Sequence, residues 1–151
     1  MILVSSCLGG IECRYNGSHA ASEKIRKLVD ENKAVMVCPE LLGGFSTPRE
    51  PAEIIGGTGE DVLNGTAKIA TASGEDVTAL YMEGAAKTLA YAKEINASAV
   101  ILKENSPSCG SGFIYNGTFS GKKITGSGVT AALLKQAGYR VISENQLDDI
   151  L

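Results

Sequence analysis

The chain has 151 residues, of which 44% are hydrophobic and 21% charged, ordinary proportions for one globular domain with a sizeable core. Its net charge of −3 speaks against non-specific nucleic-acid binding, which depends on a strongly basic surface. No apolar run approaches the length of a membrane span, and the N-terminal segment lacks the pattern of a signal peptide, so we expect a cytoplasmic protein.

Short, continuous apolar runs alternate with helical patterns along the chain. The first half of the chain predicts a strand at 2–8, a helix at 19–33 with Ser18 as its candidate cap, a strand at 34–40, a long glycine- and proline-rich loop at 41–60 and a minor strand at 67–72. The second half predicts a helix at 76–96, a strand at 98–104, loop and hairpin at 105–128, a helix at 129–137, a strand at 139–144 and a last helical turn at 145–151. This alternation predicts an α/β fold, a single-domain three-layer Rossmann-like sandwich over residues 1–151, with a mainly parallel sheet and helices on both faces.

Three of the four cysteines fall at the carboxyl ends of predicted strands, or just beyond them. These are Cys7, Cys38 and Cys109, and Cys13 follows Cys7 by six residues. In an open parallel sheet the carboxyl ends share one edge, where ligands bind. Disulfides are rare in the cytoplasm, so we expect thiols that meet at this edge to serve metal binding or catalysis.

Sequence spacing narrows the chemistry that these thiols can support. The chain has no Cys-x-x-Cys pair, and its one histidine, His19, stands alone, which argues against a structural zinc site and thioredoxin-type redox chemistry. Three scattered thiolates are compatible with an iron–sulfur cluster that keeps one iron open as a Lewis acid. A nucleophilic role for Cys109 is the alternative.

Several other residues are expected near the same edge of the sheet. Glu40, two residues after Cys38, could transfer protons. The segment 126–131 opens a predicted helix and could bind an anion there. Further candidate contacts are Ser106 and Ser108, Arg49 and Lys103, and the aromatic residues Tyr15, Phe45, Phe113, Tyr115 and Phe119, which favour a planar ligand.

Four motifs together resemble those of the thiouracil desulfidase family, long known only as a domain of unknown function. They are SSCLGG with CRYNG between residues 5 and 17, VCPE with PREPAEI between 37 and 54, KENSPSCG at 103–110, and IYNGTFSG at 114–121. The resemblance extends over essentially the whole chain. It implies a [4Fe-4S] cluster held by three cysteines, with the fourth iron binding the sulfur of a thiolated pyrimidine. Water then replaces the sulfur, without net redox change.

The resemblance also implies roles for individual residues. Cys7 and Cys109 match cluster ligands, and Cys38 is our choice for the third ligand, with Cys13 in reserve. Some members have a further cysteine where this chain has Gly43 and Gly44. The implied proton-transfer and sulfur-positioning residues match Glu40 and Ser106.

The resemblance leaves two alternatives to a desulfidase open. One is a non-catalytic iron–sulfur or sulfide-handling protein, and the other is a cluster-free enzyme with Cys109 as nucleophile and Glu40 as base. Members that act on thiouridine in tRNA carry an additional domain that this sequence lacks. We therefore expect a small-molecule substrate, a thiolated base or nucleoside.

Overall fold

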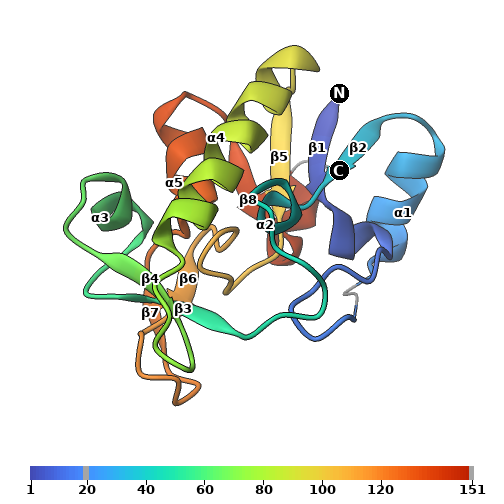
Figure 1. Cartoon of the computed structure of the whole chain (residues 1–151). Helices are drawn as coiled ribbons and strands as arrows, with labels where there is room; N and C mark the ends of the chain where they lie inside the picture. The colour runs from blue at the N-terminus through green and yellow to red at the C-terminus, as the bar shows by residue number, and fades with distance from the viewer. Residues whose placement is uncertain (19–20, 150–151) are drawn as a thin grey trace.

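The computed structural model describes residues 1–18 and 21–149. At its centre lies a four-stranded parallel sheet with the strand order β2-β1-β5-β8 (Figure 1). The four strands are β1 (Ile2–Ser5), β2 (Ala34–Val37), β5 (Ala99–Leu102) and β8 (Val141–Ser143). The prediction of a mainly parallel sheet is confirmed.

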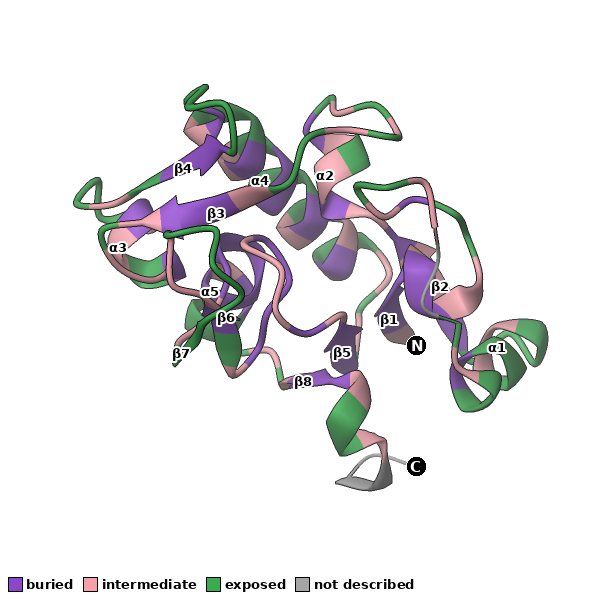
Figure 2. Ribbon diagram, turned by 90° about the horizontal axis from the view of Figure 1, so that it is seen from below, coloured by how far each residue is buried: buried purple, intermediate pink, exposed green. Residues whose placement is uncertain are grey.

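Helices cover both faces of this sheet. Side chains alternate along β1, so Leu3 packs with the helices α4 (Thr78–Glu94) and α5 (Val129–Gln136) on one face. Val4 packs with α1 (Glu23–Asp30) and the 3₁₀ segment η2 (Glu144–Asp149) on the other. Most residues of these four strands and the inner faces of the helices are buried (Figure 2). The predicted three-layer α/β sandwich is therefore confirmed.

The prediction that residues 41–60 form one long loop is wrong. This segment contains β3 (Ala52–Ile55), which pairs antiparallel with β4 (Lys68–Thr71), and the start of α3 (Gly59–Leu63). The strand β3 is stabilised by its pairing with β4, and Ile54 is buried in a third core cluster beside the main sheet. Three-residue strands β6 (Phe113–Tyr115) and β7 (Lys123–Thr125) form the predicted hairpin.

Several predicted elements are shorter than the sequence pattern suggested. The first strand ends at Ser5, and Cys7 lies in the 3₁₀ turn η1 (Ser6–Gly9). Cys38 is the N-cap of the short helix α2 (Pro39–Leu42). Helix α1 begins at Glu23 with Ser22 as its N-cap, so the expected cap at Ser18 is wrong. His19 and residues 150–151 lie outside the described residues.

Helix α4, with 17 residues, is the longest in the described part of the chain. No helix there is long and apolar enough to cross a membrane.

Candidate functional site

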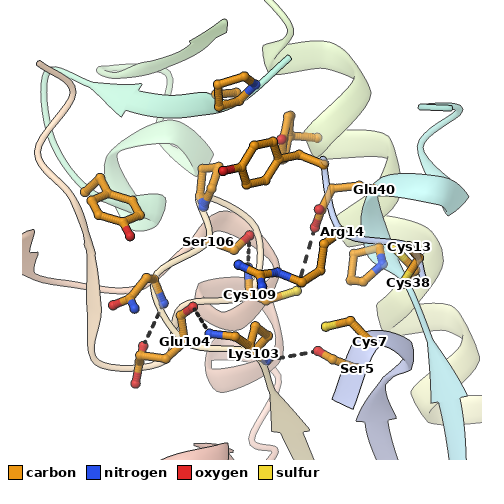
Figure 3. A pocket seen from close by; sticks show the side chains of 18 of the residues that line it. Ser5, Cys7, Cys13, Arg14, Cys38, Glu40, Lys103, Glu104, Ser106 and Cys109 are labelled. Atoms are coloured by element: carbon orange, nitrogen blue, oxygen red, sulfur yellow. Dashed lines mark hydrogen bonds between the residues drawn. The ribbon is translucent and has the colours of Figure 1, made fainter. Parts of the chain in front are cut away.

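A cavity of about 530 Å³ opens at the carboxyl edge of the sheet. The chain leaves β1 towards β2 on one side and later returns to β5 on the other, so the strand order reverses between β1 and β5. Ligands of open α/β sheets bind at such a reversal point. All four cysteines line this cavity: Cys7, Cys13, Cys38 and Cys109 (Figure 3). The predicted meeting of thiols from separate strand ends is thus observed.

Close helix packing fixes the segment that carries Cys38 and Glu40. Helix α2 lies against α4 at two glycines, Gly43 and Gly84. A Cβ atom at Gly84 would clash with the carbonyl oxygen of Pro39, and one at Gly43 would clash with that of Leu80. The absence of side chains at these positions lets the two helices touch, which holds α2 at the cavity wall.

The loop that carries Cys109 is anchored on the start of α5. The amides of Gly128 and Val129 donate hydrogen bonds to the carbonyl oxygens of Gly110 and Pro107, both 2.8 Å long, and that of Thr130 donates to Ser108 at 2.9 Å. These amides are therefore occupied, and the predicted anion site at 126–131 is wrong. The glycine pattern serves instead to bring the helix and the Cys109 loop into contact.

Burial and mutual contact raise the pKa values of Cys13, Cys38 and Cys109, which favours their protonated thiols when no metal is bound. Burial raises the pKa of Cys109 well above its usual range, and Glu40 and Cys38 raise it further. A hydrogen bond with Cys13 is the main cause that raises the pKa of Cys38. The same bond favours the thiolate of Cys13, but a second bond with Cys7 and burial outweigh it and raise its pKa to about 11. A metal bound here would displace these protons.

The arrangement of the thiols suits a ligand of several atoms. Within residues 1–18 and 21–149, no three His, Cys, Asp or Glu side chains approach closely enough to hold a single metal ion. The four thiols instead surround the cavity and present soft donors, which iron–sulfur clusters take from proteins. The residues present therefore fit such a cluster.

Glu40 is held in the cavity wall by an ion pair. Its Oε2 lies 2.6 Å from Nη2 of Arg49, whose side chain is only 6% exposed. Its Oε1 faces Cys109, 3.9 Å from Sγ. Burial would lower the pKa of Arg49, but the Glu40 carboxylate outweighs this and raises it. Arg49 is therefore a partner of Glu40, and the expectation that it contacts a ligand directly is wrong.

Two other predicted contact residues are also engaged by protein groups. Nζ of Lys103 lies at the cavity but forms an ion pair with Glu144, 2.9 Å away. The hydroxyl of Ser108 is buried and bonds to that of Thr130 at 2.7 Å. Ser106, by contrast, lines the cavity as predicted.

A buried carboxylate that the sequence analysis missed organises the loop after β5. Glu104 accepts hydrogen bonds from the amides of Ser111 (2.8 Å), Gly112 (3.1 Å) and Phe113 (3.1 Å). Burial alone would raise the pKa of Glu104, but these amides outweigh it and lower the pKa. An acidic residue two positions after a buried strand and before a glycine-rich loop was the available signal.

Glu104→Gln is expected to destabilise the protein in a pH-dependent way. Because the pKa of Glu104 is lower in the folded protein, its carboxylate stabilises the fold at neutral pH, and this contribution is lost as pH falls through the folded pKa. We expect the variant to lose about 1–3 kcal/mol of unfolding free energy at pH 7 and clearly less near pH 3, well below the usual pKa of a glutamate.

Urea unfolding of identically prepared proteins at both pH values measures this difference. Glu60→Gln, at an exposed position of α3, is the control and should match the wild type. A deficit in Glu104→Gln that is equal at both pH values would contradict the role of the charged carboxylate.

Aromatic side chains form part of the cavity wall, as a planar ligand would require. Tyr15, Tyr115 and Phe119 line it, in agreement with the prediction, whereas Phe113 is exposed and does not. Phe45 packs against Tyr81 instead, with ring centroids 4.9 Å apart. Tyr81 lines the cavity from α4, where helical periodicity gave no reason to separate it from ordinary core residues.

Comparison with known proteins gives three findings. The 2-thiouracil desulfurase family matches residues 2–146. A protein of Bacillus subtilis (strain 168), the uncharacterised YbbK, is 96% identical to this chain over 151 residues, the full length of both. A solved structure described as the [4Fe-4S]-dependent thiouracil desulfidase TudS superposes with a TM-score of 0.87 at 42% identity, covering 99% of this chain and 93% of that one.

Proposed function

This chain belongs to the 2-thiouracil desulfurase family, and on that premise we propose that it carries out iron–sulfur-dependent desulfuration of a thiouracil-like pyrimidine. The reaction converts the thiocarbonyl and one water molecule into a carbonyl and hydrogen sulfide, so no electrons are gained or lost. The observation that carries the proposal is the convergence of four thiols and one fixed carboxylate on a single cavity.

In this proposal Cys7, Cys38 and Cys109 hold a [4Fe-4S] cluster. They come from the ends of three neighbouring strands, whereas Cys13 belongs to the loop beyond Cys7 and contacts both Cys7 and Cys38. Held by these three residues, a cluster would supply an open iron, a Lewis acid suited to the soft substrate sulfur.

Glu40 is the proposed proton carrier. Its Oε2 is engaged by Arg49, which leaves Oε1 facing the cavity beside Cys109. Oε1 takes a proton from the water whose oxygen attacks the thiocarbonyl carbon. That proton then goes to the sulfur, which restores the carboxylate. The second proton of the water leaves the new carbonyl oxygen as the C–S bond breaks and also goes to the sulfur, so the products are a carbonyl and hydrogen sulfide.

Ser106 is the proposed hydrogen-bond donor to the substrate. Its Oγ accepts the amide hydrogens of Ser108 at 3.0 Å and Cys109 at 3.2 Å. Both lone pairs of the hydroxyl are then used, so its hydrogen is available to the cavity. A donor fixed in this way can orient the sulfur or a ring acceptor of the pyrimidine.

The cavity size favours a small molecule as substrate. Its volume of about 530 Å³ is typical of small-molecule sites and accommodates a base or nucleoside beside a cluster. We propose a free thiolated base or nucleoside, acted on in the cytoplasm.

Anaerobic incubation of the reconstituted protein with 2-thiouracil and 4-thiouracil tests the proposed function. We expect uracil and sulfide in equal amounts, and no product from the cluster-free protein. A protein with four irons bound that releases no sulfide from either base would instead support the non-catalytic, sulfide-handling alternative.

A nucleophilic role for Cys109 in a cluster-free enzyme is disfavoured. Nucleophilic cysteines are exposed and have lowered pKa values. Cys109 is 4% exposed, and burial raises its pKa.

A further inference from the structure

Within residues 1–18 and 21–149, the charged side chains that line the cavity are matched by protein partners, with one exception. Glu40 pairs with Arg49, and Lys103 pairs with Glu144. The other two carboxylates accept backbone amide hydrogens, Glu53 those of Gly117 and Phe119 at 2.9 and 3.2 Å, and Glu104 those of its own loop. The remaining charged residue of the cavity lining is Arg14.

The guanidinium of Arg14 has no ion-pair or side-chain hydrogen-bond partner within the described ranges 1–18 and 21–149. Its side chain is half-buried and projects into the cavity (Figure 3). Its backbone is fixed, because its amide donates to the carbonyl oxygen of Ser18 at 3.0 Å and its carbonyl accepts the amide of Gly17 at 2.8 Å. A held cation that faces a cavity without a partner indicates a ligand group with negative charge.

We propose that Arg14 is the substrate-recognition residue of this site and that its guanidinium binds the carbonyl oxygen that the thiopyrimidine retains. The inference rests on the proposed function and names a contact that selects its substrate. A thiouracil has one exocyclic carbonyl oxygen besides its sulfur, and negative charge accumulates on that oxygen as the ring loses its N–H proton. The planar guanidinium fork offers two parallel N–H donors to such an oxygen.

The other use of a lone cation here is to offset cluster charge. A [4Fe-4S]²⁺ core with three thiolate ligands carries a net charge of −1, which Arg14 could neutralise. That role would alter the reduction potential of the cluster and leave the affinity for a sulfur-free pyrimidine unchanged. The two roles therefore differ in measurable ways.

Binding of uracil to the cluster-loaded protein, measured by equilibrium dialysis, tests the proposal without requiring turnover. Uracil keeps the carbonyl oxygen and has a second oxygen in place of the sulfur, so its affinity reports the recognition contact even if desulfuration fails. We expect Arg14→Gln to weaken uracil binding and to raise KM for 2-thiouracil by about 10- to 100-fold, as loss of a charged hydrogen bond predicts. Bound iron and the reduction potential should match the wild type.

Arg26→Gln removes the same charge from an exposed position of α1 and is the matched control, expected to bind uracil as the wild type does. Arg14→Lys keeps the positive charge but loses the planar guanidinium, so it should weaken uracil binding by several-fold. This second variant tests the same contact if Arg14→Gln loses its iron. Wild-type uracil affinity in either Arg14 variant would overturn the proposal. A shifted reduction potential together with unchanged uracil affinity would assign Arg14 to the cluster.

Discussion

Replacing Cys109 with serine is expected to leave the reconstituted protein with less than a quarter of the wild-type iron and without desulfidase activity. Cys109 enters the cavity from the loop after β5, and its backbone is fixed by contacts with the start of α5. Serine preserves the size of the side chain but replaces a soft donor with a hard one. Iron and acid-labile sulfide counts, with the visible absorption of the cluster, measure the loss.

The other three cysteines supply the comparison. Cys7→Ser and Cys38→Ser should lose iron as Cys109→Ser does, whereas Cys13→Ser should retain about four irons per chain, because the proposal uses three protein ligands. If Cys13→Ser loses iron and Cys38→Ser retains it, the third cluster ligand is Cys13 and not Cys38. Retention of iron in Cys109→Ser would contradict the proposal that this cavity holds the cluster through Cys109.

Glu40→Gln is expected to lower kcat by about 10²- to 10⁴-fold while the protein keeps its iron. The carboxamide keeps the shape of the side chain but cannot take a proton from water at the position that Oε1 occupies beside Cys109. KM for 2-thiouracil should change much less than kcat, because this contact acts on the reacting water. Steady-state sulfide release under anaerobic conditions measures both constants.

Glu40→Gln also removes the charge partner of a buried cation, Arg49, so its unfolding should be measured beside its activity. Two further variants, Glu40→Asp and Glu50→Gln, separate the loss of chemistry from a loss of stability. Glu40→Asp keeps the carboxylate and should recover part of the rate. Glu50→Gln removes an exposed charge from the same segment and should be active. A Glu40→Gln variant with iron bound and a wild-type kcat would exclude proton transfer by Glu40.

The central sheet could be predicted because its strands have a local signature. β5, with sequence Ala-Val-Ile-Leu, is buried at every position, and such continuous apolar runs are recognisable without tertiary information. β3 was missed because it has four residues between Pro51 and Gly56 and depends on pairing with β4, sixteen positions further on. Strand pairing of this kind is not encoded in a local pattern.

The site shows the same division between local and long-range features. Cysteines at strand ends could be placed together because parallel strands share a carboxyl edge. The charge partners could not be predicted, since Glu40 meets Arg49 across a loop and Lys103 meets Glu144 from another strand end. Arg49 and Lys103 are therefore held by internal partners, and of the charged residues lining the cavity Arg14 has no such partner in the part of the chain that the structure describes.

The most direct test of the proposed function follows the oxygen atom during turnover. Reconstituted protein is incubated with 2-thiouracil in ¹⁸O-labelled water, without reductant or oxidant, and the mass of the uracil is compared with the amount of sulfide released. The proposed reaction predicts one ¹⁸O atom in each uracil and one sulfide for each uracil formed. Absence of uracil from protein with four irons bound, or a strict need for a reductant, would contradict it.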